Sequence, residues 1–233
     1  MKTIIFLHGW FSNCNALNCI KPLCDELNYN FYSFDLPFHG KQNEVISNIK
    51  IDLNYFCNYA INKIIQFKDQ DIILVGHSFG GLLALILSQF LDNAKKVILI
   101  NPLTPVILEN HELWNHLKNI KIKDFLSKKN LDLIKSKKNE NHLNKITKSL
   151  IVLRNIIKND LVYSYHNIEI NKNINYFLIQ GENDFLINPK DNQKELSRKI
   201  KNLQTFNIKD AKHSPHLNFE KEFIHYFKLI LNN

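Results

Sequence analysis

The sequence has no apolar run approaching the ~20 residues that a membrane-spanning helix needs. Residues 1–7 are mostly apolar, but His8, Gly9 and Trp10 interrupt them before the apolar region of a signal peptide could form. We therefore expect residues 2–8 to be a first strand. We also expect a cytoplasmic protein with no membrane partner.

Cysteine is scarce, and its spacing matches no metal-binding or disulfide pattern. The sequence contains no Cys-x-x-Cys pair and no Cys/His cluster of the zinc type. We expect free thiols, no metal site and no organic cofactor. The four cysteines are Cys14, Cys19, Cys24 and Cys57.

Short apolar runs alternate with helix-length stretches along the chain, which indicates a parallel sheet covered by helices on both faces. The predicted strands are 2–8, 30–35, 71–76, 95–101, 174–181 and 203–208. The predicted helices are about 16–28, 44–67, 79–91, 189–201 and 217–231.

One long interval breaks this alternation. About 70 residues separate the strand ending at Asn101 from the next one, which is too long for a simple connection. No linker rich in Pro, Gly or Ser bounds it. The sequence therefore predicts one α/β core, formed by 1–103 and 173–233, with a helical cap or lid inserted at 104–172.

The positive charge is concentrated in that insertion. The formal net charge is +8, and residues 113–160 hold 12 Lys or Arg against 4 Asp or Glu. Such a segment is either a solvated helix face or a surface for an acidic partner. Because the chain carries no recognisable nucleic-acid-binding motif, we expect no nucleic-acid partner.

The pattern Gly-x-Ser-x-Gly occurs at 76–80, between an apolar strand and an apolar helix. This context is typical of a nucleophile elbow, a strained turn that exposes a serine at the carboxyl edge of a sheet. The sequence predicts that Ser78 is a nucleophile.

A serine nucleophile needs a base, and the base needs an orienting acid, in the chain order Ser, acid, His. Asp184 lies just after the strand at 174–181 and is the expected acid, with Glu182 as a competitor. His213 follows the last strand and is the expected base, with His216 as its rival.

Acyl transfer also needs N–H donors for the developing oxyanion. One should come from the residue after the serine, Phe79, and one from the loop after the first strand, at Trp10. Three side chains are expected to line the substrate pocket: His77, Phe38 and Trp114.

Five segments in order resemble motifs of the α/β-hydrolase superfamily: FLHGW at 6–10, DLPFHG at 35–40, GHSFGG at 76–81, GEND at 181–184 and AKHSPH at 211–216. The resemblance implies a mostly parallel six-stranded sheet that lacks the two leading strands of the full fold. In this family the catalytic histidine stands two residues before a proline, which selects His213. Phe38 departs from the family, which has glycine there.

The chain looks most like the small capped carboxylesterases, in particular those that hydrolyse a pimeloyl-acyl-carrier-protein methyl ester in biotin synthesis. This likeness implies a small-molecule or carrier-linked acyl ester as substrate, and an acidic acyl carrier protein as partner. Thioesterases, carbon–carbon hydrolases and menaquinone-pathway lyases use the same three residues, so they remain alternatives. A non-catalytic binding protein is a further one.

Overall fold

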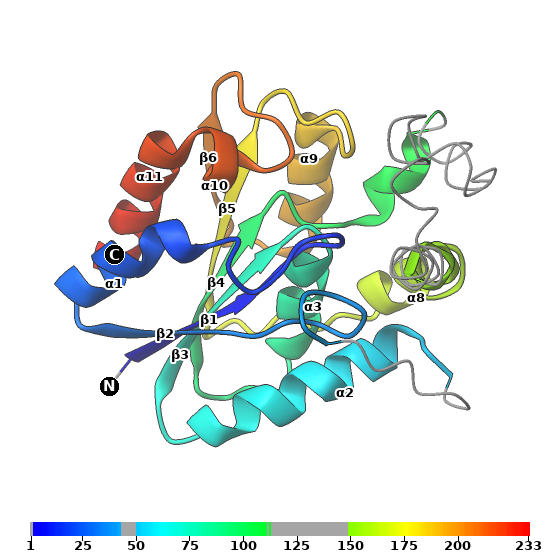
Figure 1. Ribbon diagram of the computed structural model, residues 1–233. Coiled ribbons are helices and arrows are strands. Elements are labelled where there is room, and N and C mark those ends of the chain that lie inside the picture. Colours follow the sequence, from blue (N-terminus) through cyan, green and yellow to red (C-terminus); the bar gives the residue numbers. More distant parts are fainter. Residues whose placement is uncertain (1, 43–49, 111, 113–148) are drawn as a thin grey trace, which may run out of the picture.

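The computed structural model describes residues 2–42, 50–110, 112 and 149–233. They form a six-stranded sheet in the order β2-β1-β3-β4-β5-β6, and all five neighbouring pairs are parallel (Figure 1). The predicted fold class is confirmed. The strands are β1 Lys2–Leu7, β2 Tyr29–Ser33, β3 Asp71–His77, β4 Ala94–Ile100, β5 Asn175–Gly181 and β6 Gln204–Ile208.

Helices cover both faces of the sheet, because alternate strand residues point to opposite sides. In β1, Ile5 and Leu7 pack with α2 and α3, whereas Ile4 and Phe6 pack with α1 and α11. Figure 1 shows α1 and α11 on one side of the sheet and α3 and α9 on the other. These helices are α1 Lys21–Glu26, α2 Leu53–Ile64, α3 Phe79–Leu87, α9 Pro189–Lys199 and α11 Glu220–Asn232.

Helix α2 begins later than the sequence pattern indicated. Residues 50–52 are not helical, and Asp52 caps the helix by accepting a hydrogen bond from the Tyr55 N–H at 3.0 Å. Residues 44–49 of the predicted helix lie outside the described part of the chain. The final predicted helix is divided into α10 Pro215–Asn218 and α11.

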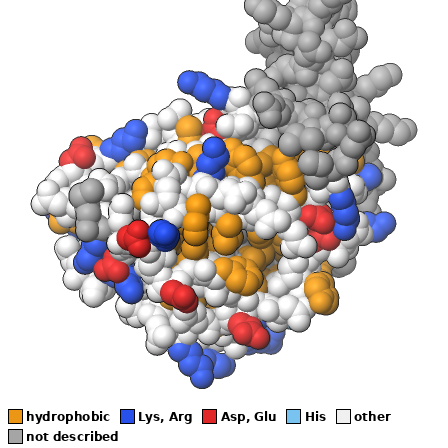
Figure 2. Space-filling view, turned by 90° about the horizontal axis from the view of Figure 1, so that it is seen from below, with side chains coloured by type: hydrophobic (Ala, Val, Ile, Leu, Met, Phe, Trp, Pro, Cys, Tyr) orange, Lys and Arg blue, Asp and Glu red, His pale blue; other side chains and the backbone are white. Residues whose placement is uncertain are grey.

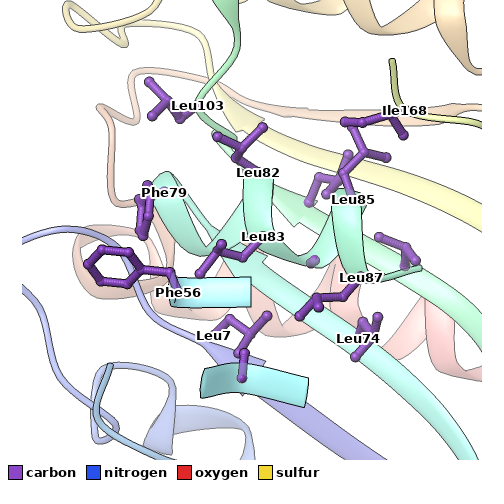
Figure 3. Close-up of a cluster of buried hydrophobic side chains, with 14 of the residues drawn as sticks. Leu7, Phe56, Leu74, Phe79, Leu82, Leu83, Leu85, Leu87, Leu103 and Ile168 are labelled. Atoms are coloured by element: carbon purple, nitrogen blue, oxygen red, sulfur yellow. The ribbon is translucent and has the colours of Figure 1, made fainter. Parts of the chain in front are cut away.

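Helix α3 is buried along almost its whole length and forms the centre of one core. Its residues Leu82, Leu83, Leu85 and Leu87 are at most 1% exposed. Figure 3 shows them pointing towards neighbouring segments on several sides, among them the strand residues Leu7 and Leu74, Phe56 of α2 and Leu103 after β4. This packing fixes the start of α3, where Ser78 lies.

The described parts of the predicted insertion, 104–110, 112 and 149–172, are largely helical. They include the 3₁₀ helix η3 Pro105–Glu109, the π-helix η4 Ile156–Asp160 and the helix α8 Leu161–His166. The rest of the insertion, with most of its lysines, lies outside the described residues. The boundaries of a separate cap therefore stay a prediction.

The described surface carries charges of both signs. Figure 2, seen from below the view of Figure 1, shows Lys and Arg interspersed with Asp and Glu around a group of hydrophobic side chains. The four cysteines are free. In the described part of the chain, no helix is long and apolar enough to cross a membrane.

Candidate active site

The candidate site lies where the strand order reverses. Strand β2 pairs with one edge of β1, and β3, which comes next in the chain, pairs with the other edge of β1. In open parallel sheets such a switch point leaves a crevice at the carboxyl ends of the strands. The loop after β1, with Gly9 and Trp10, and the turn after β3, with Ser78, both open into this crevice.

Ser78 is held in a strained turn between β3 and α3. Its backbone has φ 51° and ψ −116°, which is unfavourable for a residue with a side chain. A Cβ atom at Gly76 would collide with the backbone of Gly80, and one at Gly80 would collide with the backbone of Leu7. The two glycines are therefore required for the turn to pack against the sheet, as the motif predicts.

Three side chains from different strand ends form a continuous hydrogen-bonded line. His213 Nε2 lies 2.9 Å from Ser78 Oγ, and His213 Nδ1 lies 2.7 Å from Asp184 Oδ2. The Asp184 side chain is 1% exposed and that of His213 is 13% exposed. Because the ionised carboxylate only accepts, Nδ1 carries a proton and Nε2 is free to accept from the serine hydroxyl.

The two rivals considered from the sequence are placed elsewhere. Glu182 is exposed, and it forms no side-chain hydrogen bond within the described residues. His216 is 1% exposed, and neither of its ring nitrogens has a partner in the described part of the chain. Burial, with a smaller contribution from nearby His213, lowers the pKa of His216 to about 3. His216 is therefore a neutral wall residue and forms no hydrogen bond with Ser78 Oγ.

His77 both lines the cavity and holds the loop that carries His213. It lies on the cavity wall, and its Nε2 donates to the backbone carbonyl oxygen of His213 at 2.9 Å. Burial is the largest cause of a pKa well below 6.5 for His77. The neutral imidazole thus holds the loop that carries His213 against the elbow.

The two residues expected to donate to the oxyanion are in side-chain contact. The Trp10 indole packs edge-on against the Phe79 ring, with centroids 4.8 Å apart. Within the described residues, neither the Trp10 nor the Phe79 backbone N–H donates a hydrogen bond. Two N–H groups at this position are therefore available to a ligand.

His8 fixes the peptide that carries the Trp10 N–H. Its Nε2 accepts from the Leu36 N–H at 2.9 Å, so Nδ1 carries the proton and donates to the Gly9 carbonyl oxygen at 2.8 Å. In a trans peptide the N–H points away from the carbonyl oxygen. Anchoring the Gly9 oxygen therefore orients the Trp10 N–H.

A cavity of about 410 Å³ reaches Ser78. Its described lining holds no Asp, Glu, Lys or Arg, and its polar side chains are serines and histidines. The apolar wall combines the core and the insertion: Trp10, Phe11, Phe79, Leu103, Ile107, Leu150, Leu153, Ile157, Leu186 and Leu217.

Of the three expected substrate contacts, one lies on this wall, one lies elsewhere and one is outside the described residues. Trp114 lies outside the described residues. Phe38 is 5% exposed and packs in the core near Phe56, with ring centroids 6.3 Å apart. Its φ of 69° explains why glycine suits this turn position in the family. His77 does line the cavity.

Sequence reasoning missed Asn101, which follows β4 and donates from Nδ2 to Asp184 Oδ2 at 2.6 Å. The available signal was a polar residue at the end of an apolar strand beside the elbow strand. Among the described residues, no group of three or more His, Cys, Asp and Glu side chains could hold a metal ion.

The model of the α/β hydrolase fold family matches residues 2–144. The chain belongs to this family, and the expectation of a serine hydrolase of the esterase or lipase type is confirmed. It is 27% identical to "Putative esterase/lipase 2" of Mycoplasma genitalium over 247 residues, covering all of this chain and 90% of that protein. It is also 27% identical to the mouse "Serine hydrolase-like protein" over 49% of this chain and 36% of that one.

Solved structures of low sequence identity share the fold. An esterase from Exiguobacterium antarcticum has a TM-score of 0.73 at 18% identity, covering all of this chain and 92% of that one. The bromoperoxidase from Bacillus anthracis has a TM-score of 0.76 at 18% identity with the same coverage. At such identities the likeness concerns the fold alone.

Proposed function

We propose that the chain is a serine carboxylesterase in which Ser78 is the nucleophile, His213 the general base and Asp184 the orienting acid. The observation that carries the proposal is the line from Ser78 Oγ through the His213 ring to Asp184 Oδ2, with distances of 2.9 and 2.7 Å. Both lie within the reach required for proton transfer, about 2.6–3.2 Å. The name of the Mycoplasma genitalium relative, an esterase or lipase, supports ester bonds as the target.

In the first half of the reaction, Ser78 Oγ attacks the ester carbonyl carbon while its proton passes to His213 Nε2. The N–H groups of Phe79 and Trp10 stabilise the oxyanion of the tetrahedral intermediate. The intermediate then collapses, and the alcohol leaves with the proton from His213. The acyl group remains on Ser78.

In the second half, water attacks the acyl-enzyme and gives one proton to His213 Nε2. The second tetrahedral intermediate expels Ser78 Oγ, which takes that proton back, and the carboxylic acid is released. Asp184 stays ionised throughout and stabilises the imidazolium that forms in each half. The net reaction is ester plus water giving acid plus alcohol.

The cavity favours uncharged, aliphatic acyl groups. Its described lining offers no charged partner for an ionised substrate, and burying an unpaired charge is costly. A volume of about 410 Å³ lies within the range of small-molecule sites and suits an acyl chain of medium length.

A panel of p-nitrophenyl esters from acetate to dodecanoate tests this proposal. We expect the wild-type protein to have the highest kcat/KM on esters with acyl chains of medium length, and poor turnover of p-nitrophenyl succinate, whose acyl group carries a carboxylate. Ser78→Ala should hydrolyse none of these esters. Hydrolysis that survives in Ser78→Ala would contradict the proposed nucleophile. A matched thioester series separates the esterase from the thioesterase alternative.

The acyl carrier protein and the pimeloyl methyl ester of biotin synthesis form a narrower hypothesis, which rests on the sequence. Its support is the 12 Lys or Arg between 113 and 160. Exposed charges act mainly on encounter rates and are screened by salt over about 8 Å near physiological ionic strength. Turnover of a carrier-linked ester should then fall steeply with salt, while a small neutral ester should not respond. An equal response of both substrates would contradict a carrier-binding surface.

A further inference from the structure

The side-chain amide of Asn101 is buried between the end of β4 and the loop after β5. The residue is 1% exposed. Its Nδ2 donates to Asp184 Oδ2 at 2.6 Å, and its Oδ1 accepts from the Gly181 N–H at 3.3 Å. Both the NH2 group and the oxygen of the Asn101 side-chain amide are therefore hydrogen-bonded, to Asp184 and to Gly181.

The chemistry of these two neighbours selects an amide. An ionised carboxylate can only accept, and a backbone N–H can only donate. Asparagine satisfies both at once with no added charge. An apolar side chain at position 101 would leave the Gly181 N–H unpaired, and a second ionised carboxylate would repel Asp184.

Asn101 acts on the same carboxylate oxygen that contacts the histidine. Asp184 Oδ2 accepts from both Asn101 Nδ2 and His213 Nδ1, while Oδ1 accepts from the backbone N–H groups of Leu186 at 2.8 Å and Ile187 at 3.3 Å. No Lys or Arg in the described ranges forms an ion pair with Asp184. Hydrogen bonds, of which Asn101 supplies the shortest, are therefore the contacts that hold this buried carboxylate in place.

The backbone around Asn101 also holds the nucleophile turn. The Ser78 N–H donates to the Ile100 carbonyl oxygen at 2.9 Å, and the Leu103 N–H donates to the Ser78 carbonyl oxygen at 2.8 Å. Asn101 itself has φ 39°, a left-handed conformation that asparagine tolerates better than most residues. The segment after β4 thus joins Ser78 on one side to Asp184 on the other.

We propose that Asn101 is a positioning residue that holds the Asp184 carboxylate aimed at His213. This inference rests on the proposed function, because it assigns Asn101 a part in the same three-residue machinery. The titratable side chains that face His213 among the described residues are Asp184, His77 and His216.

Replacing Asn101 with glycine removes the amide and keeps the left-handed backbone unstrained. We expect Asn101→Gly to lower kcat by about ten- to hundredfold with KM within about twofold, since a hydrogen bond to a charged group is lost. The acid limb of kcat/KM should move up by about half a pH unit or more, because a carboxylate that has lost this hydrogen bond stabilises the inactive imidazolium more strongly.

Asn101→Asp, which preserves the shape, provides a second and independent readout. While the introduced acid holds a proton it can donate to Asp184 as the amide does, and once ionised it repels Asp184. The kcat/KM of Asn101→Asp relative to wild type should therefore fall as pH rises from about 6 to about 9. This variant gives the answer by itself if Asn101→Gly does not fold.

Thr104→Val is the matched control, because Thr104 Oγ1 donates to Asn192 Oδ1 at 2.7 Å in the same segment without contact to Asp184. We expect it to lower Tm and leave the pH profile unchanged. The positioning role would be overturned if the acid limb of kcat/KM does not move in Asn101→Gly. It would also be overturned if the kcat/KM of Asn101→Asp relative to wild type stays constant with pH. If wild type itself fails to react at Ser78 with a fluorophosphonate, the proposed function has failed, which is a separate outcome.

Discussion

The backbone carbonyl oxygen of His213 accepts a hydrogen bond from His77 Nε2 at 2.9 Å, across 136 positions of sequence. His77 precedes the elbow serine, so the same turn that presents Ser78 also anchors the loop that carries His213. The His213 ring is thereby held with Nε2 towards Ser78 and Nδ1 towards Asp184. This cross-link connects β3 with the loop after β6.

His213→Ala should lose nearly all ester hydrolysis, since the base that activates Ser78 is removed. Loss of one member of such a machinery typically removes most of a roughly 10⁶-fold contribution to kcat. His216→Leu should keep a substantial rate, because His216 forms no hydrogen bond with Ser78 Oγ. Steady-state kinetics on one ester compares the two variants. Activity lost in His216→Leu but kept in His213→Ala would reverse the assignment.

Asp184→Asn should lower kcat by orders of magnitude with a smaller effect on KM. The amide would offer a donor where His213 Nδ1–H needs an acceptor, which disfavours the productive ring orientation and tautomer. Glu182→Gln is the matched control two residues away, with an exposed side chain, and should stay within about twofold of wild type. Equal losses in both variants would argue against a specific role for Asp184.

Much of this site could be predicted from the sequence, because the strands are short apolar runs with clear ends and catalytic side chains follow strand ends. Ser78 comes directly after such a run, Asp184 and His213 lie in the loops that follow two others, and the sheet brings these strand ends together at one edge. The spacing of His213 before Pro215 also distinguished it from His216.

Features that depend on contacts between strands could not be predicted. The role of Asn101 depends on its left-handed backbone and on where β5 lies, neither of which is encoded locally. Phe38 is drawn into the core by its packing near Phe56 and not towards the cavity. The start of α2 at Leu53 depends on the cap at Asp52, whose side chain accepts from the Tyr55 N–H.

Protein stability should decrease below about pH 6.5. Burial lowers the pKa of His216 to about 3 and also lowers those of His77 and His8. These histidines take up protons near the ordinary pKa of about 6.5 in the unfolded chain, whereas in the folded protein they do not. The free energy of unfolding therefore decreases as the pH is lowered below about 6.5. For His216 alone the loss at pH 5 is roughly 2 kcal/mol.

Urea unfolding of wild type and His216→Leu at pH 8 and pH 5 tests this dependence. The variant should lose less stability between the two pH values, by roughly 2 kcal/mol, because leucine has no proton to gain. His225→Gln changes an exposed histidine and should retain the wild-type dependence. A pH response of His216→Leu identical to wild type would show that His216 is not kept neutral by burial.

The most direct measurement is the site of covalent labelling by a fluorophosphonate, which reacts with a serine only when a base activates it. Mass spectrometry of the digested, labelled protein should place the adduct on Ser78. Labelling should be absent in Ser78→Ala and strongly slowed in His213→Ala, while circular dichroism shows both variants folded. An unlabelled Ser78 in folded wild-type protein, or an adduct on another residue that persists in Ser78→Ala, would contradict the assignment of Ser78 as the nucleophile.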